Sequence, residues 1–366
     1  MTSLRIERYV LAKAMAALTI AFLVITAVEM LVGFVAISRD VGSRVDVTPL
    51  QVLTLTLMQT PSVLMLLMPF VFLFGIMGAY VGLNRRSELV AMRAAGISAW
   101  RFIAPAAAAA FAIGVVSILA FNPLAATLNA GYTQMRAGLM KSYLAGAPPQ
   151  DATWLRQGQG HQQIVIRARS RDDHNGVTLK GVSVFFYTLD ADGAPQFDRR
   201  VEASEARLRG RNWVMKNVSS VQAGGESVRS DSLTIPSPVR DSLGLQQAEA
   251  DTVSFWSLPG AIRRAEQAGL TATAYQLSFQ QLLAAPMLYA AMAILAAAFS
   301  LRLARLGGLA GLAGAGVALG FAFFFFNAVC GALGRADIVP PPIAAWTPPL
   351  IALLAGLALL CYAEDG

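Results

Sequence analysis

A charged segment between two long apolar stretches carries the side chains best suited to bind another protein. It covers residues 83–100 and reads LNRRSELVAMRAAGISAW. Arg86, Glu88 and Arg93 offer guanidinium and carboxylate groups, which form charge-assisted hydrogen bonds with groups of opposite charge. Such a segment indicates a docking site for a cytoplasmic partner, for example the separate motor of a transporter. The alternative is a plain connector at the membrane surface whose charges are only solvated.

The same segment predicts a short helix. Residues 87–95 are good helix formers, Gly96 is suited to end the helix in a left-handed cap, and Ser98 can cap the next helix. Spacing of three and four residues places a few side chains near one face, which we expect to insert into a cleft of the partner. That face consists of Leu89, Met92 and Gly96, flanked by Glu88 and Arg93.

The composition excludes an ordinary soluble protein. Of the 366 residues, 55% are hydrophobic and 14% are charged, and the mean hydropathy is +0.54. In soluble domains, by contrast, about a quarter of all residues are charged. A helix that spans a membrane needs roughly 20 apolar residues. Stretches that meet or approach this length predict a membrane protein with six transmembrane helices, at residues 15–37, 50–83, 102–126, 277–301, 309–333 and 343–362.

Arginine and lysine residues flank these spans unevenly, and such residues favour the cytoplasmic side. They gather before the first span, between the second and third, and between the fourth and fifth. Both termini are therefore expected in the cytoplasm, and the long polar stretch outside it. The predicted parts are residues 1–128 with the docking segment 84–97, an exported domain of residues 129–273, and residues 274–366.

The polar stretch reads as β structure. Many short strands at even spacing predict an all-β domain of the sandwich or jelly-roll type, inserted between the third and fourth spans. The sequence favours a closed interior over one open enough to hold acyl chains. A short surface helix is predicted at residues 258–268, where the chain returns to the membrane. The expected strands are runs rich in Val, Ile and aromatic residues, at residues 154–157, 163–168, 182–188, 200–208, 213–221 and 232–236.

Nothing in the sequence forms a catalytic centre. His161 and His174 have no cysteine or carboxylate cluster at metal-ligand spacing, and neither a nucleophile elbow nor a glycine-rich phosphate loop is present. We therefore predict no cofactor, no metal site and no ATP hydrolysis by this chain itself. The formal charge of +7 is explained by the cytoplasmic loops and the exported arginines, so no nucleic-acid partner is predicted.

The residues 86–98, RSELVAMRAAGIS, closely resemble the signature of the LptF/LptG permease family, the membrane subunits of the lipopolysaccharide export ABC transporter of Gram-negative bacteria. The opening LxxERYV at residues 4–10 resembles the amphipathic start of that family. Three spans, an exported β domain and three more spans match its layout over essentially the whole chain. The closing IVPPPIAAWTP at residues 338–348 is similar to the LptG branch.

The resemblance implies a bacterial inner-membrane protein with several partners. The chain would pair with an LptF-like sister permease through its first and fifth spans. Its β domain, in the periplasm, would join that of an LptC-like single-span protein in a bridge. The docking segment would be a coupling helix received by an LptB-like ATPase dimer, which binds the ATP and magnesium. The implied contacts with that ATPase are Arg86, Glu88, Leu89, Met92, Arg93 and Gly96.

Lipopolysaccharide carries phosphates and acyl chains. The resemblance therefore also implies a cavity in the membrane part of the protein, with apolar walls and with cations at the depth of the lipid headgroups. Arginine holds phosphate through paired, charge-assisted hydrogen bonds. Arg39 and Arg44 follow the first span, and Arg136 and Lys141 follow the third. Glu29 lies inside the first span, where an acid is costly unless it faces a cavity or a partner, and we expect it to line the cavity.

Other interpretations stay open at the level of sequence. The cations are also compatible with ordinary interfacial residues that pair with Asp40, Asp46 or lipid headgroups, and Glu29 with an acid that reaches the outer surface. For the whole chain, the alternatives are a mechanical ABC permease for another envelope lipid or lipoprotein, and a membrane-anchored enzyme that acts on envelope lipids. The missing catalytic cluster argues against the enzyme.

Overall fold

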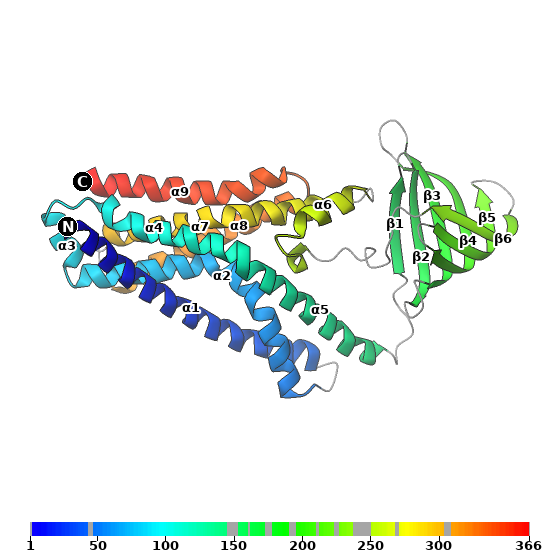
Figure 1. Cartoon of the computed structure of the whole chain (residues 1–366), viewed down its shortest axis with the longest axis horizontal. Helices are drawn as coiled ribbons and strands as arrows, with labels where there is room; N and C mark the ends of the chain where they lie inside the picture. The colour runs from blue at the N-terminus through cyan, green and yellow to red at the C-terminus, as the bar shows by residue number, and fades with distance from the viewer. Residues whose placement is uncertain are drawn as a thin grey trace. The chain divides into compact units, whose positions relative to one another are not determined.

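The computed structural model describes residues 2–42, 47–144, 153–159, 162–172, 178–189, 195–209, 212–222, 227–236, 250–267, 271–303 and 309–365. The chain forms two compact units (Figure 1). The helical unit consists of Met1–Ala137, Asp251–Leu258 and Thr273–Gly366, and the β unit consists of Gly138–Ala250 and Pro259–Ala272. The first boundary lies nine residues beyond the predicted one at 128/129, because a helix continues past the apolar stretch.

Long helices build the helical unit: α1 Thr2–Gly42, α2 Pro49–Arg85, α4 Ala99–Val116, α5 Asn122–Leu144, α7 Thr273–Leu303, α8 Leu309–Arg335 and α9 Pro341–Asp365. In the described part of the chain, six helical stretches are long and apolar enough to cross a membrane: Arg5–Gly42, Pro49–Arg85, Ala99–Met140, Thr273–Leu301, Gly314–Arg335 and Pro341–Tyr362. The six predicted spans are confirmed in length and composition.

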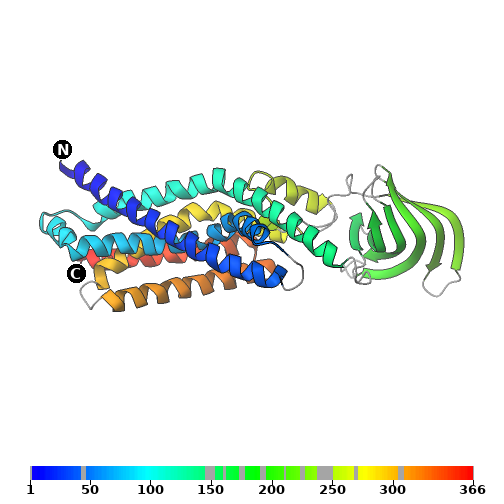
Figure 2. The ribbon, with the colours of Figure 1, turned by 90° about the horizontal axis from the view of Figure 1, so that it is seen from below.

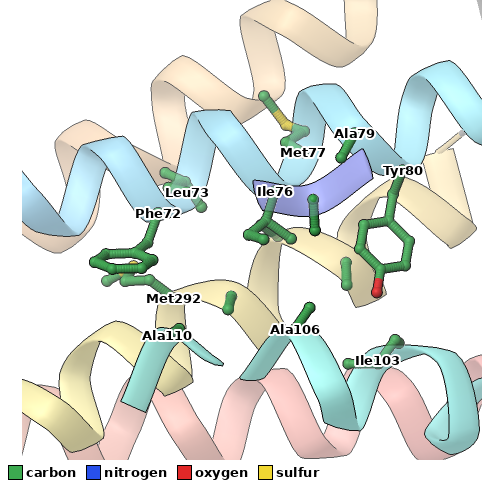
Figure 3. Packing of buried hydrophobic residues seen from close by; sticks show 14 of the residues in the cluster. Phe72, Leu73, Ile76, Met77, Ala79, Tyr80, Ile103, Ala106, Ala110 and Met292 are labelled. Atoms are coloured by element: carbon green, nitrogen blue, oxygen red, sulfur yellow. The ribbon is translucent and has the colours of Figure 1, made fainter. Parts of the chain in front are cut away.

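The core of the helical unit lies where α2, α4 and α7 meet. Figure 3 shows Phe72 and Ile76 of α2 facing Ala106 of α4 and Met292 of α7. Small residues let these helices approach closely: a Cβ atom at Gly114 of α4 would lie 2.5 Å from Pro286 Cα of α7. Close approach through small residues is a common way for helices to pack in membranes, where apolar side chains gain little by leaving the lipid.

The third span is interrupted by a π-helical turn, Ser117–Phe121, between α4 and α5. Such a turn leaves backbone groups without their usual helical partners. Here the carbonyl oxygen of Leu119 accepts a hydrogen bond from Trp256 Nε1 at 3.3 Å. Asn122 Oδ1, one residue beyond the turn, accepts a hydrogen bond from the Phe255 backbone N–H at 2.7 Å. The residues that lead back to the membrane are therefore anchored on the third span.

The described residues of the β unit form a six-stranded antiparallel sheet in the order β1-β2-β3-β4-β5-β6, so each strand pairs with its neighbours in sequence. The strands are β1 Thr153–Gln159, β2 Gln162–Asp172, β3 Thr178–Leu189, β4 Pro195–Arg209, β5 Asn212–Gln222 and β6 Ser227–Pro236. Each predicted strand lies inside one of them, and α6, Leu258–Gln267, matches the predicted surface helix. The chain is thus a helical membrane protein with a separate antiparallel β domain.

One face of the sheet is apolar and buried. Along β2, Ile164, Ile166 and Ala168 are buried while Arg167 and Arg169 are exposed, as the alternation of residue types predicts. Ile166 lies opposite Val184, and Val184 opposite Val201, so one apolar row crosses three strands. Figure 2 shows the sheet curling, which allows a single sheet to cover its own apolar face. A jelly roll in the strict sense, with its second sheet, stays a prediction.

Candidate docking segment and ion pair

The docking segment lies at one end of the helical unit. The helix α3, Glu88–Ala94, connects α2 to α4. Figure 1 shows it at the same end as the start of α1 and the end of α9. Both termini and the docking segment therefore lie at the same end of the helical unit.

The end of α3 is defined by a Schellman motif. Gly96 has a φ of +77°, which is the left-handed conformation predicted for it. Its N–H donates to Arg93 O at 2.9 Å, and the N–H of Ile97 donates to Met92 O at 3.1 Å. Ser98 then caps α4, since its side chain accepts a hydrogen bond from the Trp100 N–H. These bonds fix α3 as a short, separate helix instead of a frayed end of α2.

The two faces of α3 differ from the predicted arrangement. Leu89 is only 1% exposed and belongs to the core of the helical unit, and Met92 packs against that core. Leu89 and Met92 therefore face the bundle in this structure, and their contact with the ATPase stays a prediction. The larger apolar side chains, Leu and Met, face the bundle, where they bury the most surface. The exposed face instead carries Val90, which is 60% exposed, with Ala91, Ala94, Ala95 and Gly96.

Glu88 is held by its own chain. The Tyr9 side chain of α1 lies beside the Glu88 carboxylate and interacts with it. The second carboxylate oxygen, Oε2, is buried without a hydrogen-bond partner in the described residues. Nearby, Arg101 Nε in the first turn of α4 lies 3.3 Å from Glu7 Oε1 of α1. Of the other predicted contact residues, Arg86 is exposed and Arg93 is half-buried.

At the other end of α1, Arg136 is paired within the chain. Arg136 Nη2 of α5 lies 2.6 Å from Asp40 Oδ2 of α1, and both side chains are about two-fifths exposed, at 41% and 39%. Arg136 Nε is buried and has no hydrogen-bond partner among the described residues. Arg39 is exposed one residue before Asp40. Arg44 lies outside the described residues, and of Lys141 only the position on α5 is described.

Glu29 faces α2 and is only partly exposed. Thr60 of α2 contacts the Glu29 carboxyl group, and the Thr60 hydroxyl donates to Thr56 O at 2.8 Å. Glu29 Oε2 is buried without a hydrogen-bond partner in the described part of the chain. The structure therefore places Glu29 between two helices of the same unit. Its predicted role in lining a cavity stays a prediction.

Sequence reasoning missed Glu7 and Tyr9 as partners of the docking segment. Both belong to the opening LxxERYV, whose acid and aromatic residue precede the apolar part of α1. An acid and a tyrosine ahead of a membrane span are a weak signal, because both are common at membrane interfaces. In the described residues no group of three or more His, Cys, Asp and Glu side chains is placed to hold a metal ion.

A comparison with protein families decides the identity of the chain. Residues 8–362 match the family described as lipopolysaccharide export system permease LptF/LptG. The chain belongs to the LptF/LptG permease family. No curated protein matches the chain. As a family member with six helices fit to cross a membrane, the chain is a multi-pass inner-membrane protein of lipopolysaccharide export. The LptF/LptG match spans both units, the docking segment and the Asp40–Arg136 pair.

Proposed function

We propose that this chain is the LptG-like permease subunit of an ABC transporter that extracts lipopolysaccharide from the inner membrane and passes it to a periplasmic β bridge. A separate LptB-like ATPase dimer would bind ATP and magnesium and supply the work. The observation that carries the proposal is a capped helix between the second and third spans, with an exposed apolar face beside arginines. Family membership over nearly the whole chain supports the substrate.

The ATPase would dock on the exposed face of α3. Val90 is the largest apolar side chain on that face, and Ala91, Ala94 and Ala95 leave the helix slim enough to enter a cleft. Arg86, which precedes the helix, and Arg93, in its last turn, would pair with acids of the ATPase. Glu88 would take part through the contact it makes with α1, since its carboxylate faces the chain itself.

A sister permease would cover the first and fifth spans. Only 6% of the apolar window of α1 and 17% of that of α8 are buried, compared with 61% for α7. A helix in contact with lipid alone is also exposed in this way, but these two spans are those that pair in the LptF/LptG layout. The residues available for the contact include Val24, Leu31, Val35, Phe321 and Phe325.

The Asp40–Arg136 ion pair, together with Arg39, would receive the phosphates of lipopolysaccharide. Arg136 is held in place by Asp40 and keeps a buried Nε without a partner, and Arg39 is exposed one residue away from Asp40. A guanidinium can exchange a carboxylate for a phosphate, because both accept hydrogen bonds from its N–H groups. Arg44, Lys141 and Glu29 would complete the set, with Glu29 at the side that faces the acyl chains.

The β unit would lie in the periplasm as a jelly-roll-like domain and continue the path of the lipid toward an LptC-like partner. The buried apolar face of its curled sheet supports this role, because acyl chains need an apolar path through water. Both termini would then be cytoplasmic. ATP-driven closure of the ATPase dimer would displace α3, narrow the cavity between the two permeases and push the lipid outward.

The proposal is tested by purifying the native complex, rebuilding it in lipid vesicles with lipopolysaccharide, and measuring ATP-dependent release of the lipid to an acceptor. We expect release in the native complex. Val90→Asp should weaken ATPase binding by roughly tenfold or more, since a charge replaces an apolar contact, with each tenfold equal to about 1.4 kcal/mol. Val228→Asp, at a valine of the β unit that is 66% exposed, is the matched control and should retain the ATPase. Equal ATPase binding by both variants would contradict docking on α3.

A further inference from the structure

The first helix contacts the docking segment and the helix that follows it. The Tyr9 side chain interacts with Glu88, the first residue of α3. Glu7 Oε1 lies 3.3 Å from the Nε of Arg101, in the first turn of α4. One contact therefore lies at the start of α3 and the other beyond its end. A displacement of α3 cannot occur without either breaking these contacts or moving the start of α1.

Apolar packing fills the space between the two polar contacts. Val10 of α1 is fully buried and belongs to the same cluster as Leu89 of α3, with Ile6 and Ile97 packed against it. A small open pocket at this junction is lined by Ile6, Glu7, Ile97, Arg101 and Phe102. The junction between α1 and the docking segment is thus held mainly by apolar packing, which suits it to transmit motion.

The structure of α1 suits it to carry that motion across the membrane. It is one α-helix of 41 residues without a proline, whereas α2, α4, α7 and α9 contain internal prolines. Proline and π-helical turns are the common causes of kinks, and α4 is followed by such a turn. Figure 1 shows α1 as an uninterrupted rod. From Tyr9 to Asp40 the helix rises about 47 Å at about 1.5 Å per residue.

We propose that α1 is a rigid link that couples displacement of α3 to the Asp40–Arg136 pair, and that Tyr9 and Glu7 are the positioning residues that join the link to the docking segment. Asp40 lies at the far end of the same helix and holds Arg136 at 2.6 Å. A shift or rotation of α1 therefore moves Asp40 relative to α5 and changes how firmly Arg136 is held. The inference rests on the proposed function, because the ATPase supplies the displacement of α3.

Coupling between two sites requires an element that both sites bias, and α1 has a contact with each. The lipid end of the link is the pair itself, because a phosphate that binds Arg136 competes with Asp40 for the guanidinium. The motor end is the junction with α3. If the contacts between α1 and the docking segment are lost, ATP hydrolysis should continue without movement at the Asp40–Arg136 ion pair. Both sites remain present in such a variant.

The experiment measures the distance between two spin labels near the Asp40–Arg136 ion pair in the purified complex. Labels are placed at Ser38→Cys and Gln134→Cys, both exposed and each two residues from the pair, after Cys330 and Cys361 are replaced by serine. In the native background, we expect ATP to shift this distance. In Tyr9→Phe combined with Glu7→Gln, we expect the shift to be lost while the ATPase stays bound and hydrolyses ATP.

Two further variants separate a link from a general loss of packing. The charge exchange Glu7→Arg with Arg101→Glu keeps an ion pair between α1 and α4 and should retain the shift in a chain that keeps Tyr9. Tyr80→Phe removes a buried hydroxyl that donates to Phe102 O at 2.7 Å, leaves Glu7, Tyr9 and Arg101 unchanged, and should keep the shift.

An unchanged shift in the double variant Tyr9→Phe, Glu7→Gln would overturn the inference and leave the proposed function intact. Release of the ATPase from that variant would also overturn it, because the two residues would then serve assembly. Absence of an ATPase from the native complex would instead remove the proposed function, and the link with it.

Discussion

At the scale of single residues, the main finding is that acids and cations expected to meet partners are already held within the chain. Glu88 interacts with Tyr9, and Arg136 lies beside Asp40. Each polar group keeps one buried atom without a partner, Glu88 Oε2 and Arg136 Nε. A buried polar atom without a hydrogen bond costs about 1–3 kcal/mol. Both residues are therefore placed to gain a further partner when the complex or the lipid binds.

Substitution of Glu88 tests its role in coupling. We expect Glu88→Ala to abolish ATP-dependent lipopolysaccharide release, because α3 loses its polar contact with α1, while the ATPase still copurifies with the chain. The measurement is release from vesicles, together with the amount of bound ATPase. Unchanged release would remove Glu88 from the account of coupling.

Substitutions of Arg136 and of Asp40 should change the amount of bound lipopolysaccharide in opposite directions. Arg136→Gln removes the guanidinium, so we expect less copurified lipopolysaccharide. Asp40→Asn removes the competing carboxylate and should increase the bound lipid, by up to about fivefold, since a partly exposed ion pair is worth about 0.2–1 kcal/mol. Lipid bound per chain is measured by mass spectrometry of the purified complex. A decrease in both variants would show that Asp40 only orients Arg136 and does not compete with phosphate.

At the scale of elements, the short helix α3 depends on how it ends. Gly96 has a φ of +77°, and a Cβ atom there would meet no other atom within 4 Å. The cost of a side chain is therefore conformational and not steric. We expect Gly96→Ala to destabilise the end of α3 by about 1–2 kcal/mol and to speed amide hydrogen exchange in residues 88–97. Gly96→Asn should have a smaller effect, because asparagine adopts the left-handed conformation more readily. Equal exchange in the native chain and both variants would count against a role for this cap.

The crossing of α4 and α7 depends on Gly114 for a different reason. A Cβ atom at this position would lie 2.5 Å from Pro286 Cα, which is backbone and cannot rotate away. We expect Gly114→Val to force the helices apart and to cost about 1–3 kcal/mol, as overpacking does, seen as a lower unfolding temperature in detergent. Gly78→Ala, where a Cβ atom meets nothing within 4 Å, is the control and should unfold like the native chain. An unfolding temperature of Gly114→Val equal to that of the control would show that this contact is not tight.

At the scale of the whole molecule, local patterns in the sequence predicted the elements well. The positions of the six spans, the six strands and the left-handed Gly96 all follow from periodicity or turn chemistry, although the first and third spans extend well beyond their predicted bounds. What the sequence did not predict depends on distant contacts. Arg136 and Asp40 are 96 residues apart in sequence, and Trp256 finds its partner at Leu119, 137 residues earlier. No local sequence pattern predicts a contact between residues so far apart in the chain.

The direction of α3 shows the same limit. Spacing grouped Leu89 with Met92 but placed Gly96 on the same face, and which face turns inward depends on the bundle that receives the helix, here with Leu89 in the core. The length of α5 is a second case. Polar residues after the third span suggested the start of the exported domain at residue 129, whereas the helix continues to Leu144, because helix formation does not require apolar residues.

The central claim, that this chain is a lipopolysaccharide export permease driven by a separate motor, is tested most directly by its natural complex. The tagged chain is purified from its own membranes in mild detergent, and the bound proteins and lipids are identified by mass spectrometry. The account predicts an ATPase, a second permease with six spans, and lipopolysaccharide. A chain recovered with neither an ATPase nor a glycolipid would contradict it.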